Sequence, residues 1–262
     1  MSIFMTNRRA ALGAMGTGAA LLALASGTET LAQTNVSFAP QSTGPLADLS
    51  RRLAAIPRRR SFTTVPFMVT QPAQWDKEAA DLVLSYRYRS LQMWENSDLA
   101  GPWLNLMREA VNGQVFAHGN PDFLAVSATH GTAHLALFAQ PMWEKYRLGA
   151  LTGGKFTGNT FATPQAAVSP RDDLQNLAGY YGPANNNIAT LQQRGAVFIA
   201  CHDSIHAIAR AIHANADFAG TSPDVIAADL TNNLVPGAVL VPSVVAFIVE
   251  LRRAGFTYSK GN

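Results

Sequence analysis

Short apolar runs alternate with stretches of helical periodicity over the second two thirds of the chain. Alternating strands and helices of these lengths predict an α/β domain with a mostly parallel sheet over about residues 89–260. The apolar runs that predict its strands are RSLQMWE (89–95), DFLAVSAT (122–129), AVFIAC (196–201), AVLVP (238–242) and FTYS (256–259).

Helices are predicted between these runs. Gly113 and Gly255 are expected to end two of them, Asp203 or Ser204 to cap another, and Pro223 to lie in a first turn. The predicted helical ranges are 76–88, 99–113, 130–140, 186–195, 203–216, 222–234 and 243–255.

Two segments break this rhythm. Residues 33–88 form an N-terminal arm or linker, rich in Pro, Ser, Thr and Gln up to residue 75, with a helix predicted from 76. The cluster from Arg51 to Arg60 in this arm indicates a solvated, mobile segment or a contact to an anionic partner. Residues 151–187 are rich in Gly, Pro and Asn and form an insertion in the domain 89–262, which is either functional or flexible.

The N-terminus has the pattern of an export signal. A basic start with Arg8 and Arg9 precedes an Ala/Gly/Leu-rich stretch, and TLA before Gln33 is typical of a cleavage site at Ala32–Gln33. NRRAAL resembles the twin-arginine motif, which implies recognition by the Tat export machinery. We therefore expect a removable signal peptide over residues 1–32 and a bacterial periplasmic or exported protein.

Charge and hydropathy exclude two classes of partner. The formal net charge is +3, too small to indicate nucleic-acid binding. No further apolar run is long enough for a membrane span, so none is expected after signal removal.

GALTGGK (149–155) has nearly the spacing of a phosphate-binding loop, but Phe156 stands at the Ser/Thr position. The sequence therefore requires no cofactor.

Cys201 is the only cysteine, so no internal disulfide can form. It ends the strand AVFIAC and precedes a helix, a place where backbone N–H groups stabilise a thiolate or a persulfide. His202 and His206 could add positive charge or exchange protons there. The alternative is a buried, inert thiol.

Histidines occur in two pairs at i, i+4 spacing, His130 with His134 and His202 with His206. This spacing lets two imidazoles on one helix share a metal ion, so these four residues are metal candidates. Hydrogen-bonded structural histidines, proton transfer and ligand contact are the alternatives. Neither pair has the Glu of an H-E-x-x-H motif, and the chain has no G-x-S-x-G elbow, which argues against a zinc protease and a serine hydrolase.

Four segments, in this order, resemble the DsrE/DsrF-like family: RSLQMWE, DFLAVSATHG, QRGAVFIACHDSIHAIAR and LVPGAVLVPSVVAFIVELRRAGFTYSK. The resemblance implies a flavodoxin-like three-layer α/β fold with a mostly parallel five-stranded sheet, often assembled into homotrimers or hexamers. It also implies that Cys201 matches the cysteine on which sulfur-relay members carry a persulfide, and it marks His130 as a second site residue.

Three functions follow as hypotheses. The protein could be a sulfurtransferase or sulfur carrier that forms a persulfide on Cys201, helped by His202 or His206, and exchanges sulfur with a donor or acceptor protein. It could bind a metal or small ligand without catalysis, through the histidine pairs and the 151–187 loop. It could be a structural subunit that only oligomerises.

Overall fold

The computed structural model describes residues 43–261. The predicted signal peptide 1–32, with Arg8, Arg9 and the cleavage site at Ala32–Gln33, lies outside the described residues, as does the first part of the arm.

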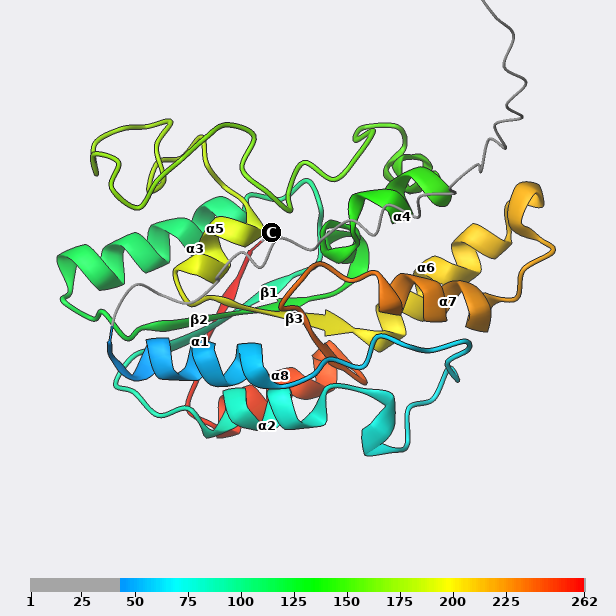
Figure 1. Cartoon of the computed structure of the whole chain (residues 1–262), viewed down its shortest axis with the longest axis horizontal. Coiled ribbons are helices and arrows are strands. Elements are labelled where there is room, and N and C mark those ends of the chain that lie inside the picture. The colour runs from blue at the N-terminus through cyan, green and yellow to red at the C-terminus, as the bar shows by residue number, and fades with distance from the viewer. Residues whose placement is uncertain (1–42, 262) are drawn as a thin grey trace, which may run out of the picture. The chain divides into compact units, whose positions relative to one another are not determined.

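Five parallel strands form one sheet in the order β4-β3-β2-β1-β5 (Figure 1). The prediction of a mostly parallel α/β sheet is therefore confirmed, and each predicted apolar run contains one strand. The strands are β1 (Leu91–Asn96), β2 (Leu124–Thr129), β3 (Val197–Cys201), β4 (Val239–Val241) and β5 (Thr257–Lys260).

Helices cover both faces of the sheet and give the three-layer arrangement of a flavodoxin-like fold. α1, α2 and α8 lie against one face, and α3 and α5 lie against the other (Figure 1). The α-helices are α1 (Pro45–Ala55), α2 (Lys77–Ser85), α3 (Trp103–Asn112), α4 (Gln140–Lys145), α5 (Ile188–Gln193), α6 (His202–His213), α7 (Pro223–Asn232) and α8 (Val244–Arg253). The short helical turns are η1 (Pro72–Gln74), η2 (Gly113–Ala117), η3 (Gly131–Leu137), η4 (Leu148–Thr152) and η5 (Ala216–Phe218).

The central strands β2 and β3 are buried along their whole length, which explains their continuous apolar runs. β5 forms one edge of the sheet, and most of its side chains are exposed. None of the helices within residues 43–261 has the length and apolar character needed to cross a membrane.

The arm packs on the domain from residue 45 onward. Its first helix, α1, which the sequence pattern did not predict, buries Leu46, Leu49 and Leu53 at helical spacing among the side chains of α2 and α8. Leu46 approaches Gly195 so closely that a Cβ there would lie 2.6 Å from the leucine side chain. Of the two alternatives for this segment, a wrapping arm is therefore the one that the described part adopts.

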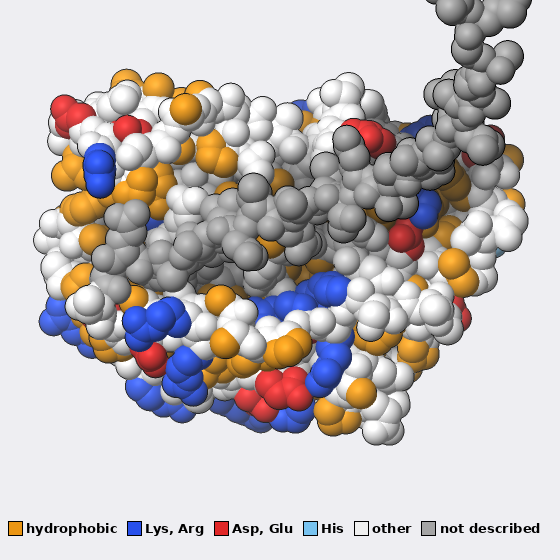
Figure 2. All heavy atoms as spheres, viewed as in Figure 1, with side chains coloured by type: hydrophobic (Ala, Val, Ile, Leu, Met, Phe, Trp, Pro, Cys, Tyr) orange, Lys and Arg blue, Asp and Glu red, His pale blue; other side chains and the backbone are white. Residues whose placement is uncertain are grey.

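The arginine cluster divides into two groups. Arg51 and Arg52 lie on the exposed face of α1, where Figure 2 shows Lys and Arg side chains gathered on the α1–α2 side of the molecule. Arg60 instead pairs at 2.9 Å with the fully buried carboxylate of Asp76, which also accepts backbone N–H bonds from Arg59 and Leu240. The prediction of a solvated, mobile segment is wrong for this second group, because a buried carboxylate needs these donors.

One predicted helix end is confirmed and one predicted helix start is wrong. The α-helical part of α3 ends at Asn112 with Gly113 at the C-cap position, although Gly113 keeps α-helical dihedral angles and the chain continues through the π-helical turn η2. Helix α6 begins at His202, with Cys201 rather than Asp203 or Ser204 at the N-cap position. The range 130–140 forms the 3₁₀ segment η3 followed by the start of α4.

Candidate functional site

Open parallel α/β sheets usually bind ligands at the carboxyl ends of their strands, next to the point where the strand order reverses. β1 is the reversal strand, because the chain moves from it to β2 on one side and returns to β5 on the other. Glu95 lies near the end of β1, His130 directly follows β2, and Tyr258 lies in β5. We call these three residues the open group.

Glu95 is the centre of the open group. Its Oε1 lies 3.0 Å from His130 Nε2, and its Oε2 accepts a hydrogen bond from the Tyr258 hydroxyl. The Tyr258 hydrogen bond is the main cause that lowers the pKa of Glu95; His130 and Lys260 add to it, and partial burial opposes it. The same bond raises the pKa of Tyr258. Glu95 is therefore ionised at neutral pH and accepts from His130 Nε2–H.

His130 keeps its second ring nitrogen free. With the proton on Nε2, Nδ1 carries a lone pair, and it has no hydrogen-bond partner within residues 43–261. The His130 side chain is 22% exposed, so a ligand can reach it. Gly131 fixes the turn that follows: its φ is +55°, and a Cβ there would lie 2.6 Å from the Ser97 carbonyl oxygen. The arrangement supplies an oriented, accessible proton acceptor.

The carboxyl end of β3 and the beginning of α6 are instead covered by the arm. His202 Nε2–H donates to the Pro66 carbonyl at 2.8 Å, and the Phe67 ring packs edge-on against His206 with 5.8 Å between centroids. Both histidines are 1% exposed, and burial lowers the pKa of each below its ordinary value. Residues 65–69 of the arm, which we call the strap, therefore hold His202 and His206 in the neutral form.

His134 is the most deeply buried histidine. It has no exposed surface, it packs against Phe138, and neither ring nitrogen has a hydrogen-bond partner in the described part of the chain. Burial lowers its pKa to about 3, and repulsion by His130 and His202 contributes a smaller part. We call His134, Cys201, His202 and His206 the closed group.

Cys201 faces the α8 side of the sheet and is 2% exposed. Its Sγ accepts a hydrogen bond from the Val244 backbone N–H at 3.4 Å, in the first turn of α8. The helix that points its N-terminus at the sulfur is thus α8, which follows β4, and not α6, which follows Cys201 itself. A helix N-terminus favours negative charge on such a sulfur, whereas burial opposes it.

The four histidines do not converge on one point. Within residues 43–261, no three His, Cys, Asp or Glu side chains are close enough together to hold a metal ion. His130 and His134 do not share a helix, because His130 has an extended backbone and precedes the 3₁₀ helix η3, which contains His134. The i, i+4 geometry of an α-helix, which would bring the two side chains together, therefore does not apply to this pair. Only His202 and His206 keep the predicted pairing, with 4.7 Å between ring centroids.

The insertion 151–187 contributes no hydrogen bond to these histidines. Its beginning is fixed by Asn159, which donates to the carbonyls of Ala136 and Phe138. Its end is fixed by Arg108, which binds Asn186 and the Tyr181 carbonyl from α3. The predicted role of this loop in ligand binding therefore has no support from its contacts.

Comparisons with family models, with curated proteins and with solved structures found no match. The site is therefore interpreted from its own geometry.

Two residues of the open group, Glu95 and Tyr258, were not predicted. Glu95 is the only carboxylate in the run LQMWEN, and a charged residue near the end of a buried strand is a usable signal. Tyr258 gave no such signal, because its place beside Glu95 depends on β5 pairing with β1, which the strand sequences alone do not specify.

Proposed function

We propose that this protein binds a small molecule at the carboxyl ends of its strands and exchanges a proton with it through His130 Nδ1. The 3.0 Å hydrogen bond between His130 and Glu95 carries this proposal, since it orients the imidazole and leaves Nδ1 without a hydrogen-bond partner among the described residues. Of the candidate residues, His130 is the histidine that combines a carboxylate partner with exposure.

Each residue of the open group has a distinct part. His130 accepts a proton from the ligand and becomes an imidazolium, which the ionised Glu95 stabilises, as a carboxylate does for a histidine base. Tyr258 donates to the second oxygen of Glu95 and thereby keeps that carboxylate in place. The ligand must present an acidic S–H, O–H or N–H group, and the proton returns from Nδ1 when the ligand is released or transformed.

Nitrogen NMR of histidine-labelled protein tests this function. The probes are sodium hydrosulfide, cysteine and acetohydroxamic acid, and His130→Gln assigns the resonance. We expect at least one probe to shift the Nδ1 signal of His130, and Glu95→Gln to weaken the response about tenfold or more. Glu250→Gln, on the exposed face of α8, is the matched control and should respond as wild type does. If no probe moves the His130 signal, the proposal is wrong.

A second candidate is the sulfur carrier, favoured by the Val244 N–H bond to Cys201 Sγ. The Cys201 thiol would attack the outer sulfur of a donor persulfide. The new bond joins Cys201 to that sulfur, the donor S–S bond breaks, and the donor leaves as a thiol that takes the released proton. No external oxidant is needed. Because Cys201 is 2% exposed, this reaction requires the surrounding segments to open.

Two measurements test the carrier function. Incubation with cysteine persulfide should add the mass of one sulfur atom to the wild-type protein and none to Cys201→Ser. Iodoacetamide should label Cys201 in the folded protein before denaturant is added. Val249→Cys in the Cys201→Ser background, which places a thiol at an exposed site on α8, provides the rate of an accessible thiol. Absence of both adducts in the folded wild type would eliminate the carrier function.

Membership of the DsrE/DsrF-like family, Tat-dependent export and assembly into trimers or hexamers belong to this second proposal. Their support is the order of the four sequence segments and the NRRAAL motif. The all-parallel five-stranded sheet is consistent with the fold that this resemblance implies.

A further inference from the structure

A second polar site lies at the opposite, amino-terminal end of the sheet, away from the candidate site. A hollow of about 370 Å³ is lined by Arg89 and Ser90, which precede β1, and by Gln114, His118 and Asn120, which precede β2. No carboxylate lines it. The hollow is open to solvent, and none of the proposed chemistry of His130 or Cys201 involves it.

Asn120 holds two of the side chains that line the hollow. It is 7% exposed, and its side-chain amide donates to Gln114 Oε1 at 2.6 Å and to Ser90 Oγ at 3.2 Å. These two bonds use an acceptor position on each neighbour. The Ser90 hydroxyl hydrogen and the Gln114 amide hydrogens are therefore left to donate, and neither has a hydrogen-bond acceptor among the described residues. The side-chain oxygen of Asn120, Oδ1, is inaccessible to solvent.

Arg89 adds a fixed positive charge. One of its terminal nitrogens donates to the Gly119 carbonyl at 2.8 Å, which anchors the guanidinium beside the hollow. The Nε and the other terminal nitrogen make no hydrogen bond to the described part of the chain. A guanidinium held in this way presents the paired donors that suit an oxyanion.

The π-helical turn η2 forms one wall of the hollow. It continues α3 with a wide turn, closed by the hydrogen bond from His118 N–H to the Gly113 carbonyl at 3.0 Å. Asn120 N–H then donates to the Gln114 carbonyl at 2.8 Å. Such π turns occur frequently at functional sites, because they reposition side chains relative to the preceding helix. Here the turn brings Gln114, His118 and Asn120 to the same hollow.

We infer that this hollow is a binding site for a small oxyanion, held by Arg89, the Ser90 hydroxyl and the Gln114 amide. These three donors line one hollow, Ser90 Oγ and Gln114 Oε1 each already accept a hydrogen bond from Asn120, and the lining contains no carboxylate. Phosphate, sulfate and carboxylate share this chemistry, and the experiment distinguishes the tetrahedral from the planar anions.

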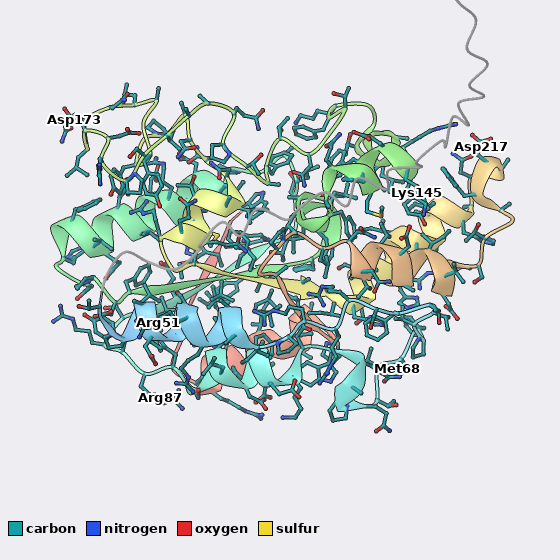
Figure 3. The ribbon with its side chains drawn as sticks, viewed as in Figure 1. Arg51, Met68, Arg87, Lys145, Asp173 and Asp217 are labelled. Atoms are coloured by element: carbon teal, nitrogen blue, oxygen red, sulfur yellow. The ribbon has the colours of Figure 1, made fainter. Side chains whose placement is uncertain are left out.

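The test is titration of the full chain with sodium phosphate, sodium sulfate and sodium acetate at constant ionic strength, followed by calorimetry and by amide NMR shifts. Arg89→Gln removes the charge, and Gln114→Glu keeps the acceptor for Asn120 but replaces the donor by a carboxylate. Arg87→Gln is the matched control, since Arg87 is exposed near the end of α2 and does not line the hollow (Figure 3).

We expect at least one anion to bind wild type and Arg87→Gln alike, with shifts at Gly119 and Asn120. Arg89→Gln should weaken binding about tenfold or more, and Gln114→Glu should abolish it. Binding of phosphate and sulfate alone would identify a tetrahedral site, and binding of acetate as well a carboxylate site. The inference is overturned if no anion binds, or if Arg87→Gln weakens binding as much as Arg89→Gln does.

Discussion

The open group and the closed group both lie at the carboxyl ends of the strands and both contain histidine, yet they differ in what covers them. His130 has Glu95 on one nitrogen and solvent access on the other. His202 and His206 lie beneath Pro66 and Phe67, which belong to the arm. The difference shows that the spacing of histidines along a helix does not decide whether a ligand can reach them. A segment more than a hundred residues earlier in the chain decides it.

The largest expected effect concerns His134. Its folded pKa of about 3 lies below the ordinary 6.5, so above pH 6.5 folded and unfolded chains are both neutral at this residue. As the pH falls, the unfolded chain takes up the proton first. The free energy of unfolding should therefore decrease by about 4 kcal/mol between pH 6.5 and about 3.

Denaturant unfolding at a series of pH values measures this decrease. In His134→Leu the decrease should be smaller by that amount, with little loss of stability at pH 7, because both unpartnered nitrogens are removed. The same substitution at the exposed His118 should leave the decrease unchanged. Equal pH dependence in wild type and His134→Leu would contradict a neutral, buried imidazole.

The next effect concerns the anchor of the arm. Asp76→Asn removes the charge that Arg60 pairs with and replaces one of the two oxygens that accept backbone N–H bonds by an NH2 donor. We expect a loss of about 3 kcal/mol in the free energy of unfolding, the lower end for a broken buried pair because Arg60 is partly exposed. Asp48→Asn, in an exposed ion pair on α1, should cost less than about 1 kcal/mol. Similar losses in the two variants would show that the anchor is unimportant.

A smaller effect concerns the strap itself. Phe67→Ala removes the ring that packs on His206 and should cost about 1 kcal/mol. Diethyl pyrocarbonate, which modifies accessible neutral imidazoles, should modify His130 in wild type and reach His206 only in this variant, as peptide mass spectrometry can measure. Met68→Ala, at the neighbouring exposed position labelled in Figure 3, is the control and should leave His206 protected. Rapid modification of His206 in wild type would remove the distinction between the two groups.

The smallest effect lies within the open group. Tyr258→Phe removes the main cause of the lowered pKa of Glu95, so that pKa should rise toward its ordinary 4.5. A carboxylate whose pKa is lowered in the folded state stabilises the fold at pH values above its ordinary pKa. The variant should therefore lose about 0.5–1 kcal/mol of its free energy of unfolding at neutral pH and less in acid. Carbon NMR of the Glu95 carboxyl measures the pKa, with Tyr88→Phe as control. An unchanged pKa would mean that Tyr258 does not hold Glu95.

The sequence allowed the five strands, the parallel sheet and most helices to be predicted, since each depends on local periodicity. It did not reveal that His130 has an extended backbone and precedes the 3₁₀ helix η3, which contains His134, and this error paired the two histidines on one helix. It also did not reveal α1, whose apolar spacing is hidden among charged and proline residues. The burial of Cys201 and the approach of Tyr258 to Glu95 depend on α8 and β5, which follow much later in the chain.

The tie between the arm and β4 has a consequence for folding kinetics. The bond from Leu240 N–H to Asp76 spans 164 positions along the chain, and that from Arg60 to the Ala238 carbonyl spans 178. Contacts between such distant residues form slowly, because the intervening chain must first be ordered. The arm is synthesised early, but these two hydrogen bonds cannot form until β4 has joined the sheet. We therefore expect the strap to be among the last segments to fold, so that the histidines of α6 are covered only when the rest of the domain is complete.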